Sequence, residues 1–248
     1  LVELINRTAE ADISRAHTDF VANASHELRT PLASIIGYVE TLAEEGEQAD
    51  PERQKKFLGT VLREAKRLQS LVDDLMSLSR VEAEKHDQPR DKVDLGVLVE
   101  RAARDGAGPD RIDRVVLRLP ESPIAVRGDA DQLEQVVRNL VDNALKYGDP
   151  GSPVVVLLAR DERDMASLRV RDRGEGIAPE HLPHLTRRFY RTDPGRSRAA
   201  GGTGLGLAIV KHIVERHRGR LDIASKLGQG TTVTIRLPIV ADETDALS

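Results

Sequence analysis

The apolar residues in the first part of the chain follow a seven-residue repeat, and this repeat limits the fold more than any other feature. Its two positions hold Val21, Leu28, Ile35 and Leu42, and, three residues after the first three of these, Ala24, Pro31 and Tyr38. Residues spaced in this way line one face of a helix and form a packed seam. The repeat therefore predicts a long amphipathic helix that packs against a helical partner.

A second helix with the same pattern follows a turn marked by Gly46 and Pro51. Its stripe consists of Leu58, Val61, Ala65, Leu68, Val72 and Leu75, and it is widened by Leu62, Leu71 and Leu78. Two such helices form a hairpin, but their apolar faces are too broad for one pair to cover. We therefore expect the hairpin to dimerise into a four-helix bundle.

The pattern changes after a polar, proline-bearing segment around residues 87–92, which we interpret as a linker between domains. Short β-rich runs begin at Val115, Val154, Ser167, Leu221 and Thr231, and helical stretches separate them near 95–104, 129–147 and 205–216. This order predicts an α/β sandwich, in which helices cover one face of a mixed sheet. The expected domains are 1–86 and 93–240, followed by a tail at 241–248.

Composition excludes several classes of function. The chain has 248 residues, no cysteine and a formal net charge of -4, so thiolate metal sites, cysteine nucleophiles and a nucleic-acid footprint are not expected. Aromatic residues make up only 2%, so aliphatic side chains must form the core. No apolar run approaches the roughly 20 residues needed to span a bilayer. Because the sequence starts at Leu1, we expect a fragment that makes no membrane contact itself, with a membrane segment upstream.

His26 lies on the outside of the first predicted helix. With Val21 and Leu28 on the seam, His26 falls at the outermost heptad position, where a solvated surface residue is the simplest interpretation. Its neighbours favour chemistry, because Glu27 can hydrogen-bond one ring nitrogen and leave the other as a nucleophile. Thr30 lies one turn further on the same face. Pro31 cannot donate to the carbonyl of Glu27, so we expect a bend there.

The predicted helix from Asp131 to Gly148 carries Asn139, Asn143 and Lys146 on a stripe beside its apolar face. Asparagine is a mediocre helix former, so two on one face suggest a task, although a polar solvent edge is the simpler alternative. Their amide oxygens suit a hard cation such as Mg²⁺. Lys146 would add charge for phosphates, and Tyr147 offers either a stacking face or a half-buried ring.

Two glycine-rich segments follow. In "DRGEGI", Asp172 ends a strand, and Gly174 and Gly176 permit a tight turn; the carboxylate can accept from an exocyclic amine, but ordinary turn chemistry also explains these residues. In "GGTGLGLAI", glycines lead into a helix start that can cradle phosphate. The stretch 192–202 between them is a candidate lid. Arg188 and Arg191 before it are candidate phosphate contacts or ordinary surface arginines.

Together these segments carry a clear resemblance. "SHELRTP", "NLVDNALKY", "DRGEGI" with "RRFYR", and "GGTGLGLAI" occur in this order and resemble the H, N, G1, F and G2 boxes of bacterial sensor histidine kinases. The resemblance covers the chain from about His17 to Pro238. The H box and the following "GYVETL" are most similar to sensor kinases of the phosphate-regulon type.

The resemblance implies a hairpin that dimerises, with residues 1–16 as an incoming signalling helix, and an ATP-binding domain of the kind shared with type II topoisomerases and Hsp90 chaperones. It implies that His26 accepts a phosphoryl group, that Glu27 assists transfer and that Thr30 serves dephosphorylation of the partner. The implied partner is the receiver domain of a response regulator, and the implied location is the cytoplasmic portion of a bacterial protein whose full length is anchored in the inner membrane.

The resemblance also implies the ligand set for ATP and Mg²⁺. Asn143 and Asn139 match the metal site, and Asp172 matches the residue that recognises the adenine amino group. The other implied nucleotide-binding residues are Lys146, Tyr147, Gly174, Gly176, Arg188, Arg191, Gly202, Thr203, Gly204, Leu205 and Gly206.

One departure concerns the F box, where Thr186 and Arg187 replace the usual aromatic and acidic residues before "RFYR". We expect weaker packing of the lid as a result. Two alternatives to a kinase remain at this point: an ATP-driven clamp of the same nucleotide fold, and a non-catalytic dimeric scaffold that docks a partner. A clamp is expected to place a glutamate where Asn139 stands, and a scaffold does not need intact asparagine and glycine motifs.

Overall fold

The computed structural model describes residues 2–45, 50–85, 87–193, 195 and 201–240 of the chain. It divides into two compact units, Leu1–Leu75 and Met76–Ser248. The first unit is a helical hairpin, and the second contains an α/β sandwich together with the last turns of the second hairpin helix. We describe each unit by itself.

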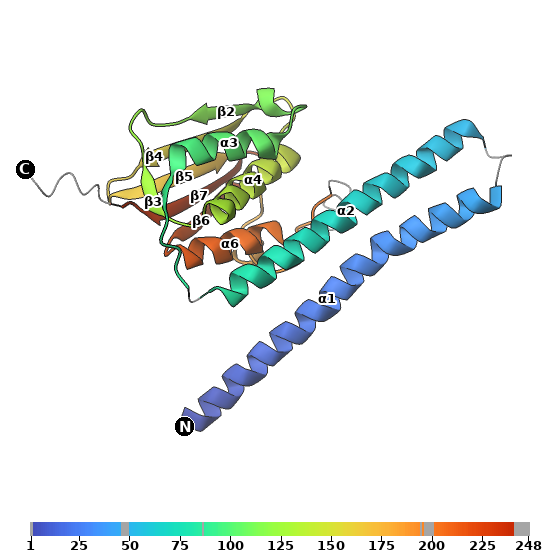
Figure 1. Ribbon diagram of the computed structural model, residues 1–248, viewed down its shortest axis with the longest axis horizontal. Coiled ribbons are helices and arrows are strands. Elements are labelled where there is room, and N and C mark those ends of the chain that lie inside the picture. The colour runs from blue at the N-terminus through green and yellow to red at the C-terminus, as the bar shows by residue number, and fades with distance from the viewer. Residues whose placement is uncertain (1, 46–49, 86, 194, 196–200, 241–248) are drawn as a thin grey trace, which may run out of the picture. The chain divides into compact units, whose positions relative to one another are not determined.

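The hairpin consists of two long antiparallel helices, α1 (Val2–Glu45) and α2 (Pro51–Ala83) (Figure 1). Pro31 lies inside α1, and the helix continues through it. The lost backbone donor therefore does not end the helix, although α1 changes direction along its length in Figure 1. The bend just below His26 stays a prediction.

Part of the predicted seam faces the interior of the hairpin, but Val21, Leu58 and Val72 of the predicted stripes are exposed. Pro31 is buried, and Leu28, Ile35 and Tyr38 are half-buried. The ring of Tyr38 lies 5.0 Å from the ring of Phe57 on α2, measured between centroids. A second apolar stripe remains open, with exposed fractions between 44% and 57% for Val21, Leu32, Ile36, Val39, Leu58, Leu62 and Val72. The hairpin thus buries only part of its apolar surface.

The second unit is built on a five-stranded mixed sheet in the order β2-β4-β5-β7-β6. The strands are β2 (Val115–Arg118), β4 (Val154–Arg160), β5 (Met165–Arg171), β6 (Arg220–Lys226) and β7 (Gly230–Pro238). The β2–β4 pair is parallel and the other pairs are antiparallel. A separate pair, β1 (Lys92–Asp94) and β3 (Ala125–Arg127), was not predicted, and its first residue falls at the end of the expected linker.

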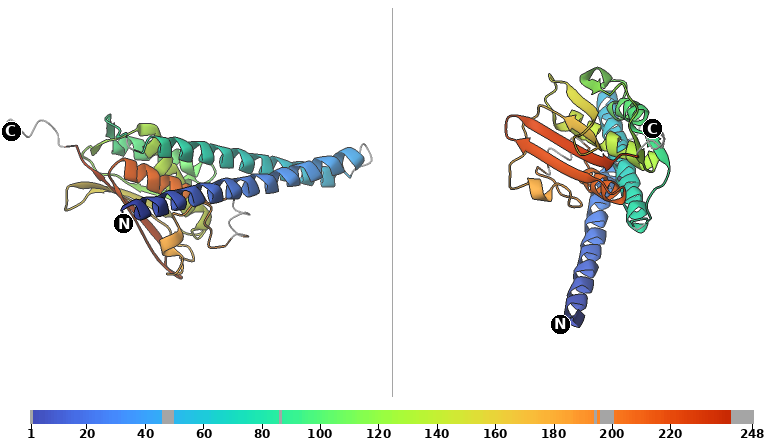
Figure 2. Two further views of the ribbon diagram at one scale, coloured as in Figure 1. Left: turned by 90° about the horizontal axis from the view of Figure 1, so that it is seen from below. Right: turned by 90° about the vertical axis from the view of Figure 1, so that its left-hand side faces the viewer.

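Helices α3 (Leu95–Ala107), α4 (Ala130–Tyr147) and α6 (Gly206–Arg216) cover one face of this sheet (Figures 1 and 2). The core between them is aliphatic, and Val156, Leu158, Leu140 and Ile209 are at most 2% exposed. Asp94 and Asp129 cap α3 and α4 by accepting hydrogen bonds from the first backbone N–H groups. Short 3₁₀ helices lie at Ile112–Arg114 and Leu182–His184.

The predicted fold class is confirmed for a single chain: a helical hairpin precedes a sandwich with helices on one face. The dimeric bundle and the proposed domain boundaries stay predictions. None of the helices in the described ranges is long and apolar enough to cross a membrane.

Candidate functional site

The hairpin presents His26 on the exposed surface of α1, as its heptad position predicts. Thr30 lies one turn away, and its Oγ1 donates a 3.1 Å hydrogen bond to the backbone carbonyl of His26. This bond is local to the helix backbone and leaves the imidazole itself on the surface. A nucleophile in this position is accessible to a separate domain or to a partner protein.

Glu27, next to His26, takes part in an ion pair between the two helices. Its Oε2 lies 3.3 Å from Nη2 of Arg67 on α2, and Nη1 of Arg67 also lies 3.7 Å from a carboxylate oxygen of Glu64. The side chain of Arg67 is only 11% exposed, so the pair is partly shielded from water. The contact was not predicted, because only the fold brings these residues, 40 positions apart, together.

In the second unit, the polar stripe of α4 meets the start of α6. Nδ2 of Asn139 donates to the carbonyl of Gly206 over 3.4 Å. A Cβ placed on Gly206 would lie 3.8–3.9 Å from the amides of Asn139 and Asn143, so both amides lie beside this backbone. Leu205 provides no side-chain cap to α6. The amides of Asn139 and Asn143 therefore lie beside the first residue of α6. The first N–H groups of a helix without a side-chain cap can bind an anion.

Lys146 lies on the same stripe of α4, and its Nζ is 2.6 Å from a carboxylate oxygen of Asp142 one turn earlier. Tyr147 ends α4 with an exposed fraction of 38%. The structure therefore brings Asn139 and Asn143 together and leaves Lys146 in an ion pair at the edge of this cluster.

Asp172 is 8% exposed at the end of β5. Its Oδ1 accepts hydrogen bonds from the N–H groups of Gly174 (2.8 Å) and Thr231 (3.2 Å). Burial raises the pKa of this carboxyl, while the two backbone donors act in the opposite direction. Both inter-residue bonds use Oδ1, so Oδ2 is the oxygen that can receive a donor from a ligand.

The glycine loops are held close to other backbone. Gly176 and Gly204 have φ of +73° and +76°, a region that side-chain-bearing residues rarely adopt. A Cβ on Gly176 would lie 2.1 Å from the carbonyl oxygen of Lys226, and one on Gly204 would lie 2.9 Å from Cα of Phe189. Gly174 approaches the carbonyl of Tyr147 in the same way, at 2.2 Å. These glycines are required by the packing of the loops, independently of any ligand.

The arginines of "RRFYR" connect to two different parts of the unit. Nη2 of Arg191 donates to the carbonyl of Gly202 over 2.9 Å, and the N–H of Phe189 donates to the carbonyl of Gly204. Arg188 forms an ion pair with Glu82 near the end of α2. Thr203 is buried and accepts from the N–H of Leu205. Most of the predicted lid, at 194 and 196–200, lies outside the described residues.

A metal site built only from protein carboxylates or imidazoles is not found: within the described ranges, no three His, Asp or Glu side chains gather for a cation. The amides of Asn139 and Asn143 fit a hard cation whose remaining ligands come from water or phosphate oxygens. The donor set therefore suits a metal that enters with a nucleotide.

The two units define a class of protein with an exposed histidine on a helical hairpin and, in an α/β sandwich, a helix start next to glycines and two asparagine amides. Residues 16–84 match the family model of the His Kinase A (phospho-acceptor) domain. Residues 128–241 match the model of the histidine kinase-, DNA gyrase B-, and HSP90-like ATPase. The second match identifies an ATP-binding domain.

Individual relatives agree with these matches. The chain is 36% identical to the sensor protein SrrB of Staphylococcus aureus over 96% of its own length. A solved structure of the mycobacterial sensor histidine kinase MprB has 32% identity and a TM-score of 0.52, and covers 60% of this chain and 97% of that one. The Acinetobacter baumannii histidine kinase AdeS has 28% identity and a TM-score of 0.65, over 86% of this chain and 98% of that one. The chain therefore belongs to the sensor histidine kinase family of two-component systems.

The match covers 41% of SrrB, so the chain spans less than half the length of the curated relatives it matches. The family assignment confirms the resemblance to sensor histidine kinases and the enzyme class of that family, protein-histidine kinase. The similarity to the phosphate-regulon type stays a prediction. The roles of the individual site residues are not tested by it.

Proposed function

We propose that this chain is a kinase core that uses ATP to phosphorylate His26 and passes the phosphoryl group to an aspartate on the receiver domain of a response regulator. The observation that carries the proposal is the cluster in which Asn139 and Asn143 lie beside the Gly206 backbone at the start of α6. Two amides beside a helix start without a side-chain cap would suit a triphosphate, and the domain matches the model of an ATPase family.

ATP is held through three groups of contacts in this proposal. Oδ2 of Asp172 accepts from the exocyclic amine of adenine, and Tyr147 covers the base. Lys146 and the N–H groups at the start of α6 neutralise the phosphates. Arg188 and Arg191 add positive charge at the loop 202–206. Asn143, with Asn139 nearby, would hold Mg²⁺, which would supply further neutralisation of the phosphate charge.

In the transfer step, an imidazole nitrogen of His26 attacks the γ-phosphorus of ATP. An N–P bond forms, the bond to the bridging oxygen breaks, and ADP leaves with the electron pair. Glu27 orients the ring and accepts its proton, which requires the Arg67–Glu27 pair to open first. A carboxylate oxygen of the response regulator then attacks the phosphohistidine, an O–P bond forms and the imidazole is regenerated. We assign the reverse task, dephosphorylation of the regulator, to Thr30.

The open apolar stripe of the hairpin supports a homodimer, because surface of this kind is normally covered by a partner. A second copy of the hairpin has a matching stripe by symmetry, which yields the predicted four-helix bundle. A membrane anchor and a sensor region outside this chain stay predictions; the curated relatives are long enough to contain both.

Incubation with γ-labelled ATP and Mg²⁺ tests the phosphoacceptor. We expect the unaltered chain and a Ser25→Ala variant to incorporate label, because Ser25 is an exposed neighbour whose hydroxyl bonds only to the helix backbone. His26→Gln should abolish incorporation, and chelation of Mg²⁺ should abolish it in every variant. Equal labelling of His26→Gln would show that the phosphoacceptor lies elsewhere.

A further inference from the structure

The last turns of α2 are bound to the ATP-binding domain by a set of polar contacts that we call the clasp. On α2 and the residues after it, the clasp consists of Ser77, Glu82, Glu84 and Asp87; on the domain, it consists of Asp129, Gln132, Gln135, Arg188, His212 and Arg216. All of these residues lie within the unit Met76–Ser248. Leu78 and Val81 pack beneath the clasp with exposed fractions of 0% and 2%, so this end of α2 is docked and not free.

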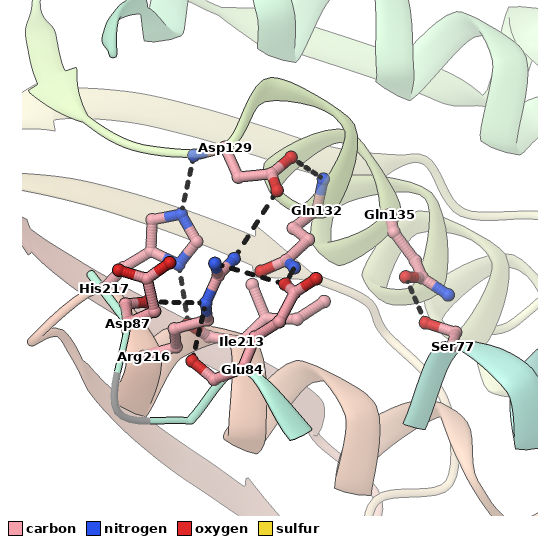
Figure 3. A network of polar contacts seen from close by, with 9 residues as sticks. All are labelled: Ser77, Glu84, Asp87, Asp129, Gln132, Gln135, Ile213, Arg216 and His217. Carbon is pink, nitrogen blue, oxygen red and sulfur yellow. Dashed lines mark hydrogen bonds and ion pairs between the residues drawn. The ribbon is translucent and has the colours of Figure 1, made fainter. Parts of the chain in front are cut away.

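One part of the clasp is formed around Arg216 of α6 (Figure 3). Its Nε donates to the carbonyls of Glu84 (3.2 Å) and Asp87 (2.9 Å). Its Nη2 lies 3.1 Å from Oε2 of Glu84, and its Nη1 donates to Oδ2 of Asp129 over 3.4 Å. The side chain is 7% exposed, so these partners are needed to stabilise a buried charge. None of these residues is a candidate ligand for ATP.

The Glu82 part of the clasp is different, because it uses a residue that the nucleotide also requires. Oε1 of Glu82 accepts from Nη2 of Arg188 and lies 3.4 Å from Nε2 of His212. Arg188 directly precedes Phe189, whose N–H is bonded to the carbonyl of Gly204 in the candidate nucleotide loop. The backbone next to Arg188 is therefore bonded to the loop, while the guanidinium of Arg188 contacts α2.

We propose that Glu82 competes with the phosphates of ATP for Arg188, so that the docked end of α2 is an inhibitory contact that loosens as the nucleotide binds. A guanidinium binds carboxylate and phosphate through the same pair of N–H donors, so one Arg188 cannot fully satisfy both. A triphosphate offers more negative charge than one carboxylate and takes the arginine when it arrives. Glu82 then retains only His212, and α2 remains attached through Arg216.

The competition has a reciprocal consequence. If ATP weakens the docking of α2, then docking of α2 weakens ATP binding by the same factor. The Glu82–Arg188 pair thereby links occupation of the nucleotide site to release of the docked end of α2. This inference rests on the proposed function, because it takes Arg188 as a phosphate contact.

The test compares Glu82→Gln with two matched variants. Glu84→Gln removes a second glutamate carboxylate of the clasp, whose partners Arg216 and Gln132 do not belong to the nucleotide site. Glu100→Gln removes a carboxylate that pairs with Arg104 on the surface of α3, at 3.0 Å. Glutamine keeps the size of each side chain, and circular dichroism checks that each variant is folded.

Two measurements are made on each protein: the dissociation constant for a non-hydrolysable ATP analogue with Mg²⁺, and hydrogen exchange of the amides at 76–83 with and without the analogue. We expect Glu82→Gln to bind the analogue about five-fold more tightly than Glu100→Gln does. A factor of about five is at the low end of typical coupling between two linked binding events. Glu84→Gln should speed exchange at 76–83 without this gain in affinity. In the unaltered chain the analogue should speed exchange at 76–83, and in Glu82→Gln it should add little.

Two results would overturn the competition alone: unaltered analogue affinity in Glu82→Gln while the parent chain binds normally, or exchange at 76–83 that does not respond to the analogue in the parent chain. Absence of analogue binding by the parent chain would instead refute the proposed function and the competition together. In that case faster apo exchange in Glu82→Gln than in Glu100→Gln would still report the clasp as a structural contact.

Discussion

The hairpin and the ATP-binding domain carry similar aliphatic side chains, but they differ in how much of this apolar surface they bury. The hairpin leaves Leu62 at 57% and Ile36 at 47% exposed, and it carries His26 on its surface. The domain buries Leu205 and Ile209 at 0% exposure and holds Asp172 at 8%. The single hairpin thus leaves apolar surface open, whereas the domain, together with the end of α2, buries its aliphatic side chains and fixes Asp172 by hydrogen bonds.

The difference between the two regions predicts which substitutions affect association and which affect folding. In the hairpin, an apolar residue should matter for association more than for the fold of the single chain. In the domain, a substitution in the candidate nucleotide site should affect folding as well, because the glycines and the carboxylate proposed for that site also pack against backbone.

The largest effect is expected from Leu62→Asp in the hairpin. In a symmetric dimer this residue is buried twice, and each buried leucine contributes roughly 1.5–3 kcal/mol. The dimer dissociation constant should rise by a factor on the order of 100 or more, measured by sedimentation equilibrium. Leu227→Asp is the matched control, because Leu227 is 61% exposed on the other unit and should leave the dimer intact.

If the two leucine variants have the same dimer dissociation constant, the open stripe of the hairpin is not the dimer interface. The contrast between the two regions then loses its main support.

The next effect concerns two glycines with nearly the same backbone conformation, Gly176 (φ +73°) and Gly228 (φ +74°). Gly228→Ala meets open space, so it should cost only the strain of positive φ, about 1–2 kcal/mol. Gly176→Ala adds a clash 2.1 Å from the carbonyl oxygen of Lys226 and should cost about 2–5 kcal/mol in total. Urea unfolding of both variants measures the difference, and equal costs would mean that the loop moves freely.

The sequence predicted the elements of both regions because their signals are local. Heptad phase placed His26 outside and Pro31 inside the hairpin, and β-rich runs located the five strands of the sheet. The short strand pair β1–β3 was missed, because three-residue strands carry no periodicity of their own. Motif spacing also indicated that Asn139 and Asn143 lie on one face, which the contact with Gly206 agrees with.

Contacts between distant segments could not be predicted in this way. Arg67 reaches Glu27 across 40 residues, and Arg216 reaches Glu84 across 132. Charged residues such as Glu82 are common on helix surfaces, so nothing local distinguishes the one that meets Arg188 from its solvated neighbours. The regulation that we infer therefore rests on the fold, whereas the candidate catalytic residues were already visible in the sequence.

A smaller effect is expected from Asp172→Asn, which separates binding from folding. Oδ1 of asparagine can still accept from Gly174 and Thr231, but its NH₂ group replaces the oxygen that faces the adenine amine. The affinity for ATP should fall about 10-fold or more, while stability is kept or raised because a buried charge is removed.

The parent chain should also lose affinity for ATP as pH falls through the raised pKa of Asp172. Calorimetric titration tests both, and unchanged affinity in the variant would remove Asp172 from the site.

The smallest effect is a pH dependence of stability in the domain. Nε2 of His217 accepts from the N–H of Asp129 (3.0 Å), so its proton lies on Nδ1, which donates to the carbonyl of Ile213 (2.7 Å). Burial lowers the pKa of His217 below its ordinary value of 6.5, because the charged ring would be desolvated. Protonation of Nε2 would also remove the acceptor for the N–H of Asp129. The unfolded chain then binds more protons than the folded one below pH 6.5.

Stability should therefore be full above that value and fall as pH drops from 6.5 toward the lowered pKa, by at most about 1.4 kcal/mol per pH unit for one proton. Urea unfolding of the domain at several pH values gives this slope. His217→Gln should be less stable at pH 8, because it loses a buried ring, and should have a flatter slope below pH 6.5. A variant slope as steep as that of the parent chain would assign the effect to another group, such as His212, whose pKa burial also lowers.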